Sequence, residues 1–496
     1  MAPSQTGGDA DASSFGLREQ NLRFILGLKL HNLRQERGLS LVQLSNGCGL
    51  SISYLNEIEK GKKYPKTDKL LALAEALGVT YNELVSADPG EKLRPIAALL
   101  STRMMDDLPL AHYGISPPVL MEIMAAGPDR LGAMLAFFAK LASRFSFSVD
   151  DLLRAAVRDD LEANNYHLPE LEDRAVSLAA EIGWQAGQAP ILSQLRFSLQ
   201  HDSGWEIDEQ KLDEFPDLAG VEAVPMASPQ QRRLFLNPAL PDGRKAFLIA
   251  REIAATALGH YHKIRKRASA TEKGFRQLQA AAQASYLGGA LLMPRQKFVE
   301  DLRKLFEETS WKDEHLLDLV ARYGGDAEVV LHRIIQLLPD LGISSRYLTR
   351  TETSGNGSQP GANREIRLGS LPEIDGAELA PHKTRATAAT RLLAEALDHP
   401  ASARATAAIE GDSKSGGRFL VLAVAQPRAL HPKEVSVSSL GILLDEASRN
   451  TIKFAGDPAL ADHGQADAEA AIDTPGASAK ARRHAALTAF HNAMNR

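Results

Sequence analysis

The apolar residues between positions 22 and 85 recur at helical spacing, in short blocks that glycine and serine separate. The first block carries Leu26, Leu30 and Leu33 and ends at Gly38. Apolar residues three and four positions apart share one face of a helix, and a glycine directly after such a run favours its end. The pattern therefore predicts a compact bundle of short helices.

The pattern changes several times in the rest of the chain. Residues 90 to 185 keep helical periodicity, in stretches such as LGAMLAFFAKLASRF. Between 190 and 237, ILSQLRFSL and RRLFLNP predict strands, and helices follow to about residue 343. TETSGNGSQPGANRE, from Thr351, has the composition of a linker. After it, RATAATRLLAEALD predicts a helix, and GGRFLVLAVAQ and VSVSSLGILLD predict strands.

Composition limits the classes to which this protein can belong. Lys and Arg number 57 against 62 Asp and Glu, and a net charge of -5 excludes a wholly basic nucleic-acid coat but permits a locally basic domain. The single cysteine, Cys48, excludes an intramolecular disulfide framework and any cysteine-rich metal site. No apolar run approaches the roughly 20 residues that span a bilayer, and the polar start lacks a secretory apolar segment. We therefore expect a cytoplasmic protein with no membrane partner.

A short turn joins the second and third helices of the predicted bundle. Ser40 is a good N-cap for the second helix and Ser51 for the third, with Gly49 in the turn between them. On the third helix, Leu55 and Ile58 face the predicted core. This layout is a helix-turn-helix, whose second helix enters the major groove of DNA. The block ISYLNEIEKGKKYPKTDKLLALAEALGV also closely resembles the XRE (lambda-repressor-like) DNA-binding family.

The resemblance implies a double-stranded DNA operator as partner and a homodimer, because such modules read paired half-sites. Asn can pair with adenine, Ser can bond several base edges, and Lys can neutralise phosphates. Leu41 stands where many relatives carry Gln, which removes one expected backbone contact. An alternative is a helical core with solvated lysines that binds no DNA. The residues expected at the DNA are Ser51, Ile52, Ser53, Asn56, Lys60, Lys62 and Lys63.

A second motif lies in FLIAREIAATALGHYH, residues 247 to 262. Zinc peptidases of the HExxH type place two His four residues apart on one helix face, with a Glu beside the first as general base. Here Glu252 is present, but Arg251 and Ala255 hold the two ligand positions, and neither can give a metal a lone pair. His260 and His262 lie two residues apart, so a helix would point them away from each other. The sequence predicts no metal, no cofactor and no catalytic residue.

The surrounding sequence resembles the ImmA/IrrE-type metallopeptidase domain. The similar segments are RRLFLNP as a strand, RKAFLIAREIA as the former catalytic helix, and QASYLGGALLMP as the next helix. The resemblance places a third ligand position of the peptidases at Ala281. The whole order of segments is similar to that of regulators of short-chain fatty acyl metabolism. That likeness implies a short-chain acyl-CoA or a related metabolite as effector.

Loss of the metal is expected to leave an apolar cleft between these two helices. Its expected walls are Ala254, Ala255, Ala281 and Tyr286, and Gly288 and Gly289 would let the helix backbones approach or leave room for a ligand. Cations near such a cleft suit a phosphate or a carboxylate. The candidate ligand-binding residues are therefore Arg244, Arg251 and Tyr286, and the alternative for Arg251 is a plain ion pair with a nearby acid.

Together these patterns predict a mainly α, multidomain protein. Its N-terminal domain is a lambda-repressor-like helix-turn-helix bundle, and its central domain is an α+β zincin-like domain without metal ligands. A small mixed α/β domain follows. The expected parts are a disordered lead (1–17), the XRE helix-turn-helix domain (18–88), a helical linker or sensor region (90–188), the degenerate ImmA/IrrE-like domain (189–345), a linker (346–372), and the C-terminal mixed domain with a flexible tail (373–496).

The leading functional hypothesis is a sequence-specific DNA-binding transcriptional regulator that is not an enzyme. One alternative is a metal-dependent peptidase that acts on a partner repressor, against which the missing ligands argue. Another is an antitoxin-like interaction protein whose DNA binding serves autoregulation only.

Overall fold

The computed structural model describes residues 23–86 except 24, and residues 149–463 except 186, 216–217, 219, 229–230, 262–269, 344–345, 353–365, 369–387, 398 and 412–416. The predicted lead, the LGAMLAFFAKLASRF helix, His262 and the chain after residue 463 lie outside the described residues. The chain divides into two compact units: residues 1–156 with 266–276, and residues 157–265 with 277–496. None of the described helices is long and apolar enough to cross a membrane.

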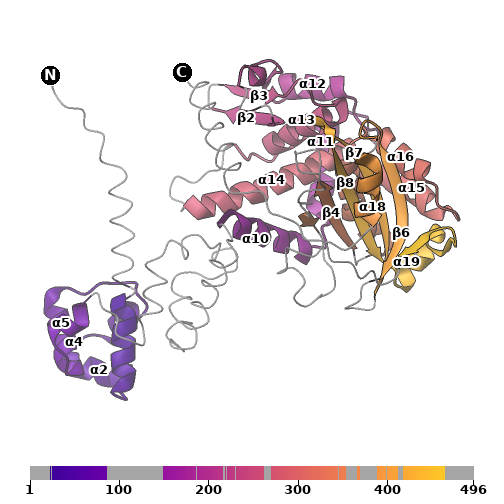
Figure 1. Ribbon diagram of the computed structural model, residues 1–496. Helices are drawn as coiled ribbons and strands as arrows, with labels where there is room; N and C mark the ends of the chain where they lie inside the picture. The colour runs from indigo at the N-terminus through magenta and orange to yellow at the C-terminus, as the bar shows by residue number, and fades with distance from the viewer. Residues whose placement is uncertain are drawn as a thin grey trace, which may run out of the picture. The chain divides into compact units, whose positions relative to one another are not determined.

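The predicted helical bundle is present in the first unit. Residues 25–36 are helical, and α2 (Leu41–Cys48), α3 (Ile52–Glu59), α4 (Thr67–Leu77) and α5 (Tyr81–Val85) follow (Figure 1). The predicted caps act as expected, because the side chains of Ser40 and Ser51 accept hydrogen bonds from the backbone N–H of Gln43 and Tyr54. Each helix contributes apolar side chains to one core: Leu26, Leu30, Leu44, Leu55, Ile58, Leu70, Leu73, Leu77 and Leu84.

The second unit contains many helices, and α10 (Val149–Ala163) and α14 (Ala270–Leu292) enter it from Val157 and Gln277 onward. The other helices are α11 (Pro169–Glu181), α12 (Leu192–His201), α13 (Asp242–Ala257), α15 (Arg295–Glu307), α16 (Asp313–Arg322), α17 (Ala327–Leu337), α18 (Ala388–Leu397) and α19 (Glu446–Thr451). Short 3-10 turns lie at Lys211–Glu214, Leu338–Leu341 and Lys453–Gly456.

The strand predicted over ILSQLRFSL is wrong, because this segment forms α12. Leu195 and Leu199 are fully buried and lie four residues apart, which is the spacing of one helix face. Gln194 accepts a hydrogen bond from the backbone N–H of Ile191 and supports the start of the helix. Short apolar stretches fit both periods, and here packing against α13 favours the helix.

Two sheets complete the second unit. The smaller has the order β1-β3-β2, with β1 (Glu206–Asp208) parallel and β2 (Ala223–Ala227) antiparallel to β3 (Arg232–Leu236). The larger has the order β5-β4-β8-β7-β6-β9. Its strands are β4 (Arg346–Glu352), β5 (Ile366–Leu368), β6 (Arg404–Gly411), β7 (Arg418–Arg428), β8 (His431–Leu443) and β9 (Ala461–His463).

The central strands of the larger sheet are covered on two faces. On β7, Ala423 and Ala425 pack against α18, which lies across the sheet in Figure 1. The alternate residues Leu420, Leu422 and Val424 join the main core with side chains of α16 and α17. Burial on two faces accounts for the continuous apolar run FLVLAVA, since alternating strand residues point to opposite faces.

The assignment of residues 346–372 to a linker is wrong at β4 and β5. β4 pairs with β8 along its whole length, from Arg346 opposite Ile442 to Glu352 opposite Ser436. Its sequence, RYLTRTE, has only two apolar residues, which are adjacent, and one of its anchors is the buried Arg346. Apolar periodicity therefore gives no strong signal for this strand.

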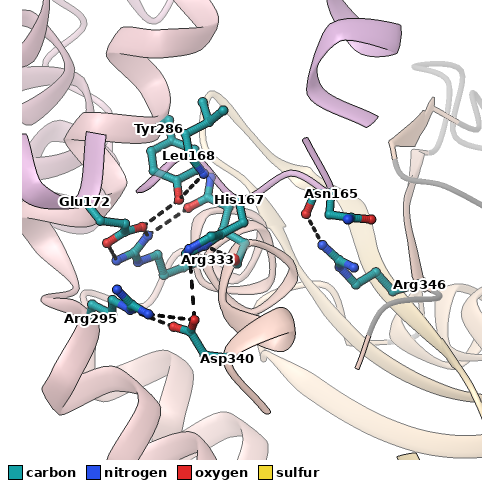
Figure 2. Close-up of polar contacts among 10 residues, drawn as sticks. Asn165, His167, Leu168, Glu172, Tyr286, Arg295, Arg333, Asp340 and Arg346 are labelled. Atoms are coloured by element: carbon teal, nitrogen blue, oxygen red, sulfur yellow. Dashed lines mark hydrogen bonds and ion pairs between the residues drawn. The ribbon is translucent and has the colours of Figure 1, made fainter. Parts of the chain in front are cut away.

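A buried ion pair holds α11 to α17 inside the second unit (Figure 2). The guanidinium of Arg333 contacts both carboxylate oxygens of Glu172, at 2.6 and 2.8 Å, and its Nε donates to the carbonyl of Met293. The hydroxyl of Tyr286 on α14 donates to the same carboxylate at 2.6 Å and accepts from the backbone N–H of Leu168. One buried carboxylate thus connects three helices.

The turn before α11 is fixed by a second buried arginine. Asn165 and Tyr166 both have φ of 52°, in the left-handed region that non-glycine residues rarely occupy. The guanidinium of Arg346, the first residue of β4, is fully buried and donates to the carbonyls of Asn165 and Ile335. Burial lowers the pKa of Arg346 to about 10. The packed Tyr166 ring and these hydrogen bonds hold the turn in its strained conformation.

The Glu172–Arg333 pair predicts a large loss of stability on substitution. Burial raises the pKa of Glu172, but hydrogen bonds from Arg333 and Tyr286 outweigh burial, so the pKa lies below its ordinary value. Glu172→Gln leaves the Arg333 charge buried and should lower the free energy of unfolding of the second unit by about 3–5 kcal/mol. In the wild type, the contribution of Glu172 to the free energy of unfolding should be lost as the pH falls from about 4.3, the pKa of an unfolded glutamate, through the lower pKa of Glu172 in the folded protein. The stability of Glu172→Gln should depend less on pH in this range.

Tryptophan fluorescence during urea denaturation can measure this change, because all three tryptophans, Trp184, Trp205 and Trp311, belong to the second unit. Glu181→Gln is the matched control, since Glu181 ends the same helix and pairs with Arg174 at the surface. Its unfolding should match that of the wild type. Equal midpoints for the two variants would contradict the role given to the buried pair.

Candidate functional site

The turn between α2 and α3 is built from residues that close it locally. Gly49 follows α2 with φ of 69°, a conformation that suits glycine. The hydroxyl of Ser45 donates to the carbonyl of Leu50 at 2.6 Å. Ser51 then caps α3 through a 3.3 Å hydrogen bond from the backbone N–H of Tyr54. These contacts fix the direction of α3 relative to α2.

One face of α3 is buried and the opposite face is open. Leu55 and Ile58 are fully buried in the core of the first unit. Ser51, Ile52 and Ser53 are exposed, and Asn56 is half-buried. The side chain of Ile52 is 46% exposed. Four of the residues expected at the DNA therefore lie at the start of α3 and along its open side.

A charged cluster anchors the end of α3 to the first helix. Glu59 is 7% exposed, and its carboxylate accepts from Arg34 at 2.6 and 2.9 Å and contacts His31 Nδ1 at 2.8 Å. Burial raises the pKa of Glu59, but these two partners outweigh burial and lower it. A side chain at Gly27 would meet the carbonyl of Ile58 at 2.6 Å, so the first helix needs glycine at this contact.

The three candidate lysines differ in their surroundings. Lys60 is half-buried, and Lys62 is exposed. The ammonium of Lys63 pairs with Glu57 at 2.7 Å, and this pair raises the pKa of Lys63. The ammonium groups of Lys63 and Lys69 lie 5.6 and 4.5 Å from the centre of the Tyr54 ring. Of the two exposed lysines, Lys63 is already engaged by Glu57 and Tyr54, so Lys62 is the better candidate for a phosphate contact.

The peptidase-like helix is α13, and the side chains at its ligand positions do not fit a metal. Arg251 and Ala255 lie at the positions of the two histidines, and the Arg251 guanidinium donates to the Glu252 carboxylate at 3.2 Å. Glu252 is 3% exposed and also accepts a short hydrogen bond from Tyr261. Burial is the largest cause that raises the pKa of the Tyr261 hydroxyl, and the negative charge of Glu252 raises it further. The hydroxyl therefore stays protonated and acts as the donor. Among the described residues, no group of three His, Cys, Asp or Glu side chains could hold a metal.

The two helices expected to form the apolar cleft, α13 and α14, are in direct contact at Gly288. A side chain at Gly288 would lie 2.9 Å from the backbone nitrogen of Arg251, so the two backbones touch there. Ala254 and Tyr286 are buried in the core, whereas Ala281 is exposed. Gly288 thus permits the close approach of the helices, whereas a side chain at Gly289 would meet nothing within 4 Å.

The three candidate ligand-binding residues are not brought together. Tyr286 is bound to Glu172 in the core, and Arg251 is bound to Glu252. Arg244, at the start of α13, pairs with Glu222 at 2.8 Å and Asp326 at 3.2 Å. Burial lowers the pKa of Arg244, but the neighbouring carboxylates outweigh burial and raise it.

Arg244 also lines a cavity that the sequence did not indicate. The other charged residues of its lining are Glu222, Asp326, Glu328, Arg350 and Arg428. They come from four separate stretches of sequence, so no local motif marks them. A partial signal is Gly324–Gly325–Asp326, a turn followed by a helix cap, but this pattern alone does not specify a site.

Comparisons with known proteins agree with two of the resemblances. Residues 30–84 match the helix-turn-helix family, and residues 215–334 match the family of the IrrE N-terminal-like domain. No curated protein matches the chain. A solved structure with similarity is a Mycobacterium tuberculosis transcriptional regulator, at 20% identity and a TM-score of 0.42, over 60% of this chain and 95% of that chain. The chain therefore contains an XRE-type helix-turn-helix domain followed by an IrrE-like domain.

Proposed function

We propose that this protein is a transcriptional regulator that binds specific duplex DNA through α3. The observation that carries the proposal is the helix-turn-helix of residues 30–84, with its capped α3 open on one side. Ser53 and Asn56 offer hydrogen bonds to base edges, and Ile52 offers methyl groups. Lys60, Lys62 and Lys63 follow at the end of the helix, where cations can contact phosphates.

We further propose that the IrrE-like domain is not a working peptidase. The support is chemical: a permanently protonated guanidinium and a methyl group stand at two ligand positions. The carboxylate of Glu252, the position of the general base, is already engaged by Arg251 and Tyr261. A general base would need to reach a metal-bound water instead. Because residues 215–334 are similar to a peptidase family, the absence of peptidase activity needs a direct test.

A homodimer and a short-chain acyl-CoA effector stay predictions of the family resemblance. The dimer would match a two-fold symmetric operator. An effector can act only if it binds the DNA-bound and free states with unequal affinity. Titration of the protein–operator complex with acetyl-CoA and propionyl-CoA tests the effector, and analytical ultracentrifugation tests the dimer. A toxin gene beside the coding sequence would favour the antitoxin-like alternative.

The first test of DNA recognition separates base contacts from phosphate contacts. Asn56→Ala should cost about 1–3 kcal/mol at one base position of a selected operator and relax the preference there. Lys62→Ala should weaken binding to all sequences alike and lower the slope of log K against log salt concentration by about 1. Fluorescence anisotropy over a salt series measures both effects. If each variant binds as the wild type does, α3 is not the recognition helix.

The second test concerns the exposed Ile52. Its methyl groups can contact the C5 methyl group of thymine, which uracil lacks. Replacing single thymines of the operator by deoxyuridine should weaken wild-type binding at one position in each half-site. Ile52→Ala should bind the two DNAs equally well. A thymine preference that survives in the variant would show that Ile52 does not read the base.

The third test concerns the metal. After dialysis against a metal-free buffer, the purified protein should retain no stoichiometric zinc, because α13 offers no ligand pair. Plasma mass spectrometry measures the content, and His260→Ala controls for adventitious binding by the half-buried turn after α13. Close to one zinc per chain in the wild type would reopen the peptidase interpretation.

A further inference from the structure

A cavity of about 370 Å³ opens where the IrrE-like domain meets the larger sheet of the second unit. The starts of α13 and α17 form one side of this seam cavity, and the β7–β8 hairpin forms the other. Its size is at the lower end of the range of small-molecule sites. It is separate from the former metal position, which lies further along α13.

The walls of the seam cavity are held in place without a ligand. A side chain at Gly243 would overlap the carbonyl oxygen of Gly324 at 1.7 Å, so α13 rests directly on the turn before α17. Gln426 of β7 accepts from the backbone N–H of Ala327 at 2.7 Å and donates to the carbonyl of Gly325 at 3.3 Å. The sheet is thereby bonded to the start of α17. Preformed walls lower the ordering cost of binding.

The lining carries both signs of charge in equal number. Arg244, Arg350 and Arg428 share this lining with Glu222, Asp326 and Glu328, and Arg428 also pairs with Glu434 of the β7–β8 hairpin. Arg244 lies between all three carboxylates, at 2.8, 3.2 and 3.8 Å, and Arg350 lies 2.8 Å from Glu328. A ligand of one charge would meet as many like charges as opposite ones in this wall. A ligand with both charges can pair each with its opposite.

The uncharged part of the lining indicates which uncharged groups a ligand could carry. Pro241, Pro427 and Leu430 supply a small apolar surface, and Ser436 and Ser438 supply hydroxyl groups. We propose that the seam cavity binds a small zwitterion of amino-acid or dipeptide size, with its ammonium toward Glu222 and Asp326 and its carboxylate toward Arg350 and Arg428. The site is independent of the proposed DNA recognition.

The experiment uses the full-length protein and a panel of probes. The panel is the standard amino acids without tyrosine, which is too insoluble, and without tryptophan, which would mask the fluorescence of the protein. Glycyl-glycine, glycyl-leucine and leucyl-glycine complete it, each probe at about 10 mM, a concentration at which millimolar binders raise the melting temperature. Tryptophan fluorescence follows the melting of the second unit, and calorimetry gives the Kd of any probe that binds. For that probe, the matched amine without the carboxyl group and the matched acid without the amino group should each bind at least about tenfold more weakly.

Variants then locate the site. Glu222→Gln and Arg350→Gln should each weaken binding of the zwitterion at least about tenfold, because each removes one charge while keeping a hydrogen-bonding side chain. Arg233→Gln is the matched control, since Arg233 pairs with Glu206 at 2.5 Å outside the cavity. It should bind as the wild type does.

Three results would overturn the proposal. They are a panel in which no zwitterion changes the melting temperature, a matched amine or acid that binds as tightly as its zwitterion, and cavity variants that bind like Arg233→Gln. The comparison of matched probes needs only the wild type, so it decides the question even if a cavity variant fails to fold. Operator binding is measured separately, and its failure leaves these results unchanged.

Discussion

The contact on which the second unit depends is the buried pair of Glu172 and Arg333. It joins α11, which precedes the IrrE-like match, to α17 inside it, and Tyr286 adds α14. Taking two charges out of water is unfavourable, and here the cost is offset because every charged atom has a close hydrogen-bonding partner. The pair therefore specifies one arrangement of three helices, which apolar packing alone would leave less defined. Arg346 does the same for the turn before α11, where it binds two backbone carbonyls of segments far apart in the sequence.

Contacts between protein groups also hold α13 of the IrrE-like domain in place. The ligand positions lie on α13, but the helix is held by Gly288 on α14 and by the hydrogen bond from Trp205 to Thr256. None of these contacts needs a metal. The backbones of α13 and α14 touch at Gly288, and the seam cavity lies at the start of α13, against the larger sheet.

Local signals account for what the sequence predicted well. Ser40, Gly49 and Ser51 act within a few residues of their own positions, so the helix-turn-helix could be placed in detail. β7 was predicted because burial on two faces leaves an apolar run, and β8 because its valines alternate with serines before a short apolar stretch. α12 was missed because its short apolar stretch fits a strand as well as a helix, and β4 was missed because a buried arginine anchors it. The seam cavity is lined by Glu222, Asp326, Arg350 and Arg428. The first and last of these residues lie more than two hundred positions apart in the sequence. Contacts over such a separation cannot be predicted from the periodicity or local motifs of a single sequence.

The carboxylate of Glu252 also limits how a metal site could be built on α13. It is almost completely buried, and Arg251 and Tyr261 are its side-chain partners. A two-histidine site would need histidine at positions 251 and 255, and the first of these changes removes Arg251. The chain would then keep a buried carboxylate that has lost one of its partners, which is costly. Histidine at position 251 is therefore expected to lower the stability of the second unit, whatever affinity for metal the pair would add.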